Sequence, residues 1–314
     1  KQGGFSYERS TNNVFDNEIN IDYASGSGTN ILTINYTVAS NHTASDLDYV
    51  ATNSLTLNGG TIKDAAGNAA SLTLVNPGAS GSLGANKAIV IDNDVPIMSI
   101  TAAEGVDGFI SNDSTLSLTF TSSEAITDFI IGDIAVTGGT ISAFVAVNDT
   151  TYSATFTPSG EGAKIIGVAS GTYKDIAGNE NIAAEQFNWT YDGTLPTITG
   201  VSLASDNSTI AVTFSEAVYN TAGGSGSLER SDFGFSISGG SASLSSSTPS
   251  SISVSSNTYT LGISLSGTAN GSETLTVNPA SSAIYDVVGN AASNSQSNNT
   301  ASLNNANYVL NLNG

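Results

Sequence analysis

Carboxylate side chains at regular positions are the feature of this sequence that could carry chemistry. The pattern Asp-x-x-Gly-Asn occurs three times, and its aspartates, Asp64, Asp175 and Asp286, stand 111 residues apart. Further acids precede prolines in two short segments, residues 92–96 and 192–196. Carboxylate oxygens without thiolate or imidazole partners are the ligands that Ca²⁺ prefers. The acids therefore predict a structural Ca²⁺ site wherever the fold brings several of them together.

The composition excludes several classes of protein. Acidic residues outnumber basic ones by 27 to 7, and the formal charge of −20 makes nucleic acids and anionic membranes poor partners. The chain has no cysteine, so it has neither a disulfide nor a thiolate metal site. No apolar run approaches the roughly 18–20 residues of a membrane span. We expect no nucleic-acid binding and no membrane insertion.

The elements that must position the acids are β-strands. Apolar and polar residues alternate in many short segments, including 32–38, 116–120, 152–156, 210–214 and 259–265. Such alternation predicts strands with one buried face, and Gly-, Ser- and Asn-rich turns between them are typical of β-sandwiches. Each Asp-x-x-Gly-Asn segment predicts a tight turn, because glycine accepts the left-handed conformation and aspartate can bond the local backbone.

The fixed interval between the turns predicts a tandem array. Repeats of this kind outweigh the estimate of about two domains that length alone gives, at roughly 150 residues per domain. The boundaries fall at the two Asp-to-Pro segments, because proline can open an edge strand without needing a hydrogen bond from its nitrogen. We predict units at residues 1–94, 95–194 and 195–303, followed by a tail at 304–314.

Several segments carry a resemblance to a known family. They are Tyr49 to Asp64, Phe214 to Val218, the three Asp-x-x-Gly-Asn turns and the two Asp-to-Pro linkers. They resemble the bacterial Ig-like repeats of very large surface adhesins, and the Asp-Asn-Asp-x-Pro linker is similar to the calcium linkers of cadherins. The resemblance implies three Ig-like β-sandwiches on a bacterial surface. It is specific for the domain type and less so for function, because such repeats serve as stalks, spacers and binding tips.

In an Ig-like sandwich the second and sixth strands both run towards the end at which the chain enters. A glutamate after the second strand and the turn aspartate after the sixth should therefore meet the acids of the incoming linker. The first such group is Asp92, Asp94, Glu124 and Asp175, and the second is Asp192, Glu216 and Asp286. We expect each group to hold Ca²⁺. The alternative is that the turn aspartates only cap their own loops and the linker acids are solvated.

Some positions of the repeat are weaker candidates for ligands. Asp64 has neither a matching glutamate nor a preceding linker in this sequence, so a site there is less expected. Asn68, Asn179 and Asn290 close the three turns, and we interpret them as turn residues rather than ligands.

Catalysis has little support in the sequence. His42 is the only histidine and stands in a polar turn, and no serine has a base or oxyanion motif nearby. Asp46 and Asp48 could be imagined as a pair of glycosidase carboxylates, but only one tryptophan is present and no aromatic cleft is evident. We expect a protein that is not an enzyme.

Glycan binding is the alternative to a structural role. Trp189 and Tyr191 lie two residues apart beside the second linker and could stack on a sugar ring. The competing interpretation is that both side chains pack on the junction and stiffen it. An exposed aromatic platform would favour a glycan-binding module of a larger secreted protein.

The two ends of the sequence suggest self-assembly. Only 63 residues precede Asp64, whereas unit two has 79 residues from Pro96 to Asp175, so unit one is expected to lack one or two opening strands. In the tail, Tyr308, Leu310 and Leu312 alternate like one face of a strand. Donor-strand addition of this tail to the first unit of another copy would build a head-to-tail filament. The alternative is a cut fragment with a frayed end.

Together these features predict an all-β, non-catalytic protein that is secreted and exposed on a bacterial surface. Its expected role is to extend or stiffen an adhesive appendage with the help of Ca²⁺.

Overall fold

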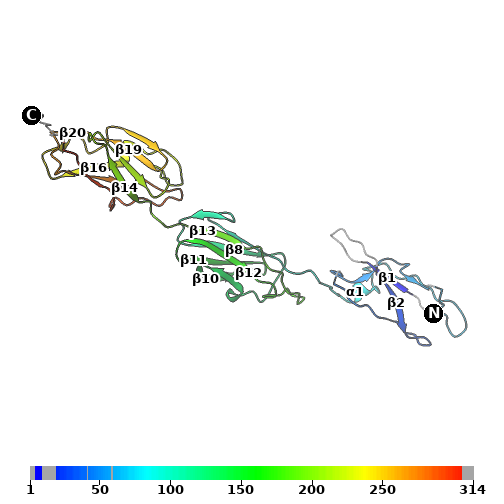
Figure 1. Ribbon diagram of the computed structural model, residues 1–314. Helices are drawn as coiled ribbons and strands as arrows, with labels where there is room; N and C mark the ends of the chain where they lie inside the picture. The colour runs from blue at the N-terminus through cyan, green and yellow to red at the C-terminus, as the bar shows by residue number, and fades with distance from the viewer. Residues whose placement is uncertain (1–3, 9–18, 41, 58, 306–314) are drawn as a thin grey trace, which may run out of the picture.

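The computed structural model describes residues 4–8, 19–40, 42–57 and 59–305. The structure is nearly all β, as the alternation predicts, and its sheets fall into three groups that follow one another along the chain (Figure 1). Each group lies within one of the predicted units, and the unit boundaries themselves stay predictions. No helix in the described residues is long and apolar enough to cross a bilayer.

The described residues of the first unit form a sheet in the order β3-β2-β1-β4, with β5 also paired to β1. Its elements are β1 (Gly4–Glu8), β2 (Ile19–Ser25), β3 (Thr33–Ile34), β4 (Asp48–Tyr49), β5 (Leu55–Thr56) and the short helix α1 (Leu83–Asn86). Among the described side chains of this unit, the buried apolar cluster is small: Ala44, Leu47 and Ile91.

The alternation at residues 32–38 gives a strand only at Thr33–Ile34, so the sequence overestimated this strand. Leu32 and Val38, expected to face inward, are exposed. The physical reason is that alternation stabilises a strand only where a second apolar layer covers its inner face. In the described part of the first unit that layer is thin.

The second unit is a sandwich of two four-stranded sheets, β10-β11-β8-β6 and β7-β13-β12-β9. Its strands are β6 (Met98–Ala102), β7 (Phe109–Ser111), β8 (Leu116–Ser122), β9 (Ile134–Thr137), β10 (Gly139–Ala146), β11 (Thr151–Pro158), β12 (Gly162–Val168) and β13 (Phe187–Tyr191), with a 3₁₀ turn η1 (Ile131–Asp133). Leu116, Leu118 and Phe120 on β8 are fully buried, while the residues between them are less so. The inward-facing residues of both sheets fill one core.

The third unit repeats the sandwich with more irregular edges. Its sheets are β14-β15-β19-β18, β16-β21-β22 and the pair β17-β20. The strands are β14 (Ile198–Leu203), β15 (Thr209–Phe214), β16 (Phe233–Ser238), β17 (Ser243–Leu244), β18 (Ile252–Ser255), β19 (Thr258–Gly262), β20 (Leu265–Ser266), β21 (Thr274–Pro279) and β22 (Thr300–Ser302), with η2 (Arg230–Asp232). Ile210, Val212 and Phe214 on β15 lie in its core.

A buried carboxylate holds the end of the third unit that lies away from its linker. Glu273 is fully buried, and its two oxygens accept hydrogen bonds from the backbone N–H groups of Ser241, Ala242, Asn270 and Gly271 at 2.8–3.2 Å. The Ala242 N–H, helped by the other N–H groups and opposed by burial, lowers the pKa of Glu273 to about 2 from an ordinary value of 4.5. The charged form of this side chain therefore joins two loops.

Glu273 should make the stability of the third unit depend on pH. Because its pKa is lower in the folded than in the unfolded chain, its contribution is complete above about pH 4.5 and is lost as pH falls towards 2. Glu273→Gln should lower the melting temperature at pH 7 and flatten this part of the acid dependence. Circular dichroism from pH 7 to 2 measures both effects. Fluorescence of the single Trp189, in the second unit, serves as the internal control, and equal acid profiles for both proteins would contradict the assignment.

Candidate metal centres

The Asp-x-x-Gly-Asn turn is built around its own aspartate. In the second unit the Asp175 carboxylate accepts hydrogen bonds from the N–H groups of Gly178 and Asn179 at 2.6 and 2.8 Å, and from the Asn179 amide at 2.7 Å. Gly178 has φ of 98°, a conformation that favours glycine. Asp286 is held in the same way in the third unit. These bonds fix the carboxylate at the tip of the turn.

The first acidic cluster forms where unit one joins unit two. Asp92 comes from the linker, Glu124 follows the end of β8, and Asp175 comes from the turn. One carboxylate oxygen from each lies within 4.8 Å of the others. Asp175 is buried, and the other two are half-buried. The structure thus brings together three of the four acids predicted for this junction.

The second cluster has the same construction at the next junction. Asp192 lies in the linker, Glu216 follows the end of β15, and Asp286 is the turn aspartate. Their nearest carboxylate oxygens also lie within 4.8 Å of one another, with Asp286 fully buried. All three acids predicted for this junction meet.

Asp94 is the predicted ligand that the structure places outside the first cluster. It is exposed, and its backbone N–H donates to Asp92 Oδ1 at 3.1 Å. Thr194 occupies the corresponding position of the second linker and makes the same bond to Asp192. Asp94 is thus close to Asp92 in the chain but lies outside the group of carboxylate oxygens that meet within 4.8 Å. Periodicity could not predict this local arrangement.

The electrostatics of both clusters disfavour three free carboxylates. Burial and then the charges of Asp92, Asp175 and Asp94 raise the pKa of Glu124. Burial and then the charges of Asp286 and Asp192 raise the pKa of Glu216, with the Ser215 hydroxyl acting weakly in the opposite direction. Each glutamate is thus partly desolvated beside like charges, an arrangement that a bound cation would stabilise.

The turn asparagines connect the linkers to the units that follow them. Asn179 Nδ2 donates both to Asp175 Oδ2 and to the carbonyl of Asp92, at 2.7 and 3.1 Å. Asn290 repeats this with Asp286 and the carbonyl of Asp192, at 2.8 and 2.9 Å. These amides act as hydrogen-bond donors, which agrees with their interpretation as turn residues. Their bond to the linker was not predicted, because the same residue pattern forms a turn with or without a linker beside it.

The turn of the first unit holds its aspartate, Asp64, by hydrogen bonds of the same kind. Asp64 accepts hydrogen bonds from the N–H groups of Ala66 and Asn68 and from the Asn68 amide, all at 2.9 Å. Both turn ends are exposed, and no further acid of the described residues joins Asp64 in a cluster. A site at Asp64 stays less expected than one at the other two turns.

Two buried hydroxyl groups lie beside the first cluster. Ser122 ends β8 two residues before Glu124, and Tyr173 stands two residues before Asp175. Ser122 is 5% exposed and Tyr173 is 1% exposed, and neither hydroxyl has a hydrogen-bond partner in acceptable geometry. Burial raises the pKa of Tyr173 to about 12, the nearby Ser122 hydroxyl acts in the opposite direction, and the Glu124 charge raises it further. A bound ion or one of its water ligands would satisfy buried hydroxyls that lack a well-formed hydrogen bond.

The donor sets fit a hard divalent cation. Each cluster offers carboxylate oxygens alone, with no sulfur or imidazole nitrogen in either group. Oxygen-only sets favour Ca²⁺ or Mg²⁺ over zinc and copper, and Ca²⁺ accepts the six to eight ligands and loose geometry that loops can supply. The orphaned hydroxyls beside the first cluster support the fit.

The residues considered for catalysis have structural partners. His42 Nδ1 accepts a hydrogen bond from the Ala39 N–H at 3.1 Å and pairs with the Tyr36 hydroxyl at 2.8 Å. Burial opposes charge on Asp48, but hydrogen bonds, including one from the Gly78 N–H, keep its pKa below the ordinary value. Asp48 thus ties β4 to the loop before α1.

Trp189 does not form the aromatic platform considered for a sugar. Its side chain is 1% exposed, its Nε1 donates to Ser111 Oγ at 3.1 Å, and its ring stacks on Phe109 with centroids 5.9 Å apart. Tyr191 packs against it edge-on within the same unit, and packing of the two side chains on the junction stays a prediction. Glycan binding stays a hypothesis, now without this platform.

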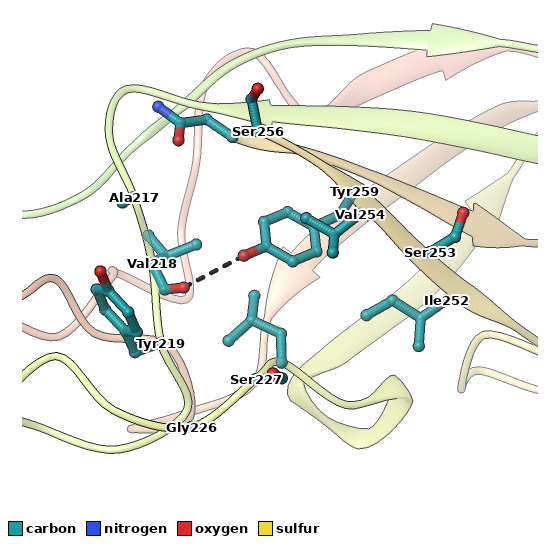
Figure 2. Close-up of a pocket in the computed structure, with 12 residues that line it drawn as sticks. Ala217, Val218, Tyr219, Gly226, Ser227, Ile252, Ser253, Val254, Ser256 and Tyr259 are labelled. Atoms are coloured by element: carbon teal, nitrogen blue, oxygen red, sulfur yellow. Dashed lines mark hydrogen bonds between the residues drawn. The ribbon is translucent and has the colours of Figure 1, made fainter.

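A surface pocket of about 320 Å³ lies in the third unit between the loop after β15 and strands β18 and β19 (Figure 2). Apolar side chains line it, including Val218, Ile252 and Val254, and the Tyr259 hydroxyl donates to the Val218 carbonyl at 3.2 Å across one side. None of the residues that line it carries a charge. Its lining therefore offers no carboxylate or basic side chain.

The linker bond of the turn asparagine can be tested by one isosteric change. Asn290→Asp replaces a buried donor with a carboxylate that faces Asp286 and the Asp192 carbonyl. In the presence of chelator, the free energy of unfolding of the third unit should fall by about 1–3 kcal/mol. Asn68→Asp is the matched control, because Asn68 is exposed and its amide faces Asp64 without a linker. Chemical unfolding by circular dichroism compares them, and equal losses would refute the linker role.

Comparison with known proteins agrees with this architecture. Residues 92–191 match the sequence model of the bacterial Ig-like domain. No curated protein matches the chain.

The similar solved structures include InvD of Yersinia pseudotuberculosis, with 17% identity and a TM-score of 0.29 over 66% of this chain and 57% of InvD. Invasin, described as a bacterial integrin-binding protein, has 15% identity and a TM-score of 0.28 over 58% of this chain and 36% of invasin. The Yersinia pseudotuberculosis adhesin InvE has 15% identity and a TM-score of 0.23 over 66% of this chain and 58% of InvE. The chain thus spans less than two thirds of each.

The family match coincides with the second unit, from the linker acid Asp92 to the end of β13. This unit has two packed sheets, short strands and a single core. Residues 92–191 are therefore a bacterial Ig-like domain.

Proposed function

We propose that this chain is a non-catalytic rod of Ig-like units in an adhesive protein of a bacterial surface, and that Ca²⁺ at the two acidic clusters stiffens the rod. The observation that carries the proposal is the meeting of three carboxylates, within 4.8 Å, at each junction. The adhesive and surface-exposed part is supported by the bacterial Ig-like domain and by the resemblance of the repeats to large surface adhesins.

A cation at such a cluster would restrain the angle between two units. Each cluster combines one acid of the linker with two acids of the unit that follows. Units joined by a short linker are expected to move relative to one another unless a large interface prevents it. An ion that binds all three acids would tie the linker to the turn and to the end of a core strand. This would replace a flexible joint with a fixed one.

The overall charge gives a second reason for cations. The chain carries a formal charge of −20, and part of it is concentrated in the half-buried clusters. Self-repulsion of this kind opposes a compact arrangement, and divalent counter-ions relieve it. Ca²⁺ is preferred over Mg²⁺, because Mg²⁺ demands near-ideal octahedral geometry and gives up its waters reluctantly.

Millimolar Ca²⁺ should raise the melting temperature and reduce flexibility at the junctions. A ligand present at ten- to a hundredfold above its Kd stabilises the folded state by about 1.4–2.7 kcal/mol per site. Replacing Glu124 and Glu216 together by glutamine should abolish the calcium response. Calorimetry and small-angle scattering, with and without chelator, measure both effects.

The matched control is Glu185→Gln, which removes an exposed carboxylate outside both clusters. It should leave the calcium response unchanged. If chelation alters neither the melting nor the scattering of the unaltered chain, the metal part of the proposal fails.

Assembly into a filament is the second part of the proposal. The tail residues Tyr308, Leu310 and Leu312 lie outside the described residues, so the support comes from the acceptor side. In the first unit a pocket of about 230 Å³ is lined by Leu32, Leu55, Leu57 and Ile62, together with polar residues. An alternating apolar strand from another copy could fill pockets of this kind while adding backbone hydrogen bonds.

The filament hypothesis predicts that chains associate in solution only when the tail is present. Deleting residues 306–314 should give a monomer at concentrations at which the full chain associates, as measured by light scattering. Leu310→Asp should act like the deletion, whereas Val309→Asp, on the opposite face of the alternation, should have a smaller effect. Identical masses for the full and truncated chains at high concentration would remove the hypothesis.

A further inference from the structure

The two acidic clusters differ in the charge around them. Three residues separate the linker aspartate from proline in each case, in the segments Asp-Asn-Asp-Val-Pro and Asp-Gly-Thr-Leu-Pro. The third position is Asp94 in the first linker and Thr194 in the second, and both make the same backbone bond to the linker aspartate. Asp94 stands two residues after Asp92 and its N–H bonds the Asp92 carboxylate, so its charge lies close to the first cluster. Thr194 supplies no charge to the second cluster.

The clusters also differ in the buried side chains that stand two residues before their glutamate and their turn aspartate. Ser122 pairs with Met98, and Phe214 pairs with Ile198, so Ser122 and Phe214 occupy the same place in their units. Tyr173 and Ile284 correspond too, because each stands two residues before its turn aspartate. The first pair carries two buried hydroxyls that lie near each other and have no hydrogen bond of acceptable geometry, whereas Phe214 and Ile284 are buried and apolar.

We infer that the first junction takes up a divalent cation at lower concentration than the second, because Ser122 and Tyr173 hold a water ligand of the ion and Asp94 adds charge. The inference rests on the proposed function, since it concerns the order in which the two sites are filled. The rod would therefore stiffen in two steps, beginning at the joint between units one and two.

The hydroxyl groups favour cation binding at the first site because they would gain a hydrogen-bond partner when the ion and its water bind. A buried hydroxyl without a partner is unfavourable, and a water ligand of the ion would supply a partner for it. Groups of this kind around a metal orient its ligands, and their loss typically weakens binding by about 10- to 100-fold. The apolar pair Phe214 and Ile284 has nothing to donate to such a water.

Nearby charge acts in the same direction. The affinity of a Ca²⁺ site rises with the number of acidic groups around it. Asp94 is exposed, so solvent screens part of its charge, and its effect is expected to be smaller than that of the hydroxyl groups.

The test isolates each site in the full chain. Glu216→Gln leaves the first site, and Glu124→Gln leaves the second. Titration calorimetry with CaCl₂ should give a Kd about 10-fold or more lower for the Glu216→Gln chain than for the Glu124→Gln chain. Equal affinities, or tighter binding by the second site, would overturn the inference. Absence of calcium binding by the unaltered chain would instead defeat the proposed function, and the inference with it.

Two sets of variants test the cause of the difference. In the Glu216→Gln chain, Ser122→Ala with Tyr173→Phe should raise the Kd about 10-fold, while Ser99→Ala, which removes an exposed hydroxyl of β6, should not. The linker positions allow a reciprocal exchange: Asp94→Thr should weaken the first site, and Thr194→Asp should strengthen the second.

The melting temperature of these variants in chelator shows whether the two hydroxyls act on the metal site or only on the stability of the fold. Loss of a merely structural hydroxyl would change that melting temperature and leave the Kd unaltered. An unchanged Kd after removal of both hydroxyls would contradict the role given to them.

Discussion

The hydrogen-bonded carboxylate of the turn aspartate is the interaction on which each junction depends. Asp175 and Asp286 use one oxygen to bind the backbone of their own turn, and the asparagine amide binds the other oxygen together with the linker carbonyl. A side chain held in this way cannot rotate away from neighbouring acids. The turn therefore fixes both the path of the linker and the place where negative charge accumulates.

The sandwich fold then brings distant acids to this turn. Glu124 and Glu216 follow the buried strands β8 and β15, whose alternating residues fill the cores, so their positions are set by packing rather than by their charge. Desolvation and like charges raise the pKa of both glutamates. The cores hold together an arrangement of carboxylates that would separate in an isolated peptide.

The two junctions share this geometry but differ in the side chains around it. At the second junction Asn112 of unit two donates to Asn290 Oδ1 at 3.1 Å, which gives a direct side-chain contact between units. At the first, Asn93 of the linker donates to the carbonyl of His42 in unit one. The two junctions thus share one backbone arrangement and differ in their local contacts.

The sequence by itself located strands at residues 116–120, 152–156, 210–214 and 259–262, the three turns, and the six acids that meet at the junctions, out of seven that it predicted. Alternation and a fixed interval are local signals, and an antiparallel sandwich converts them directly into positions. Only the tertiary structure decided the rest. Asp94 lies outside the first cluster, two sheets bury Trp189, and the position of the linker makes Asn179 and Asn290 bond to it. These outcomes depend on which side of a strand or loop meets another element, and no single segment of sequence contains that information.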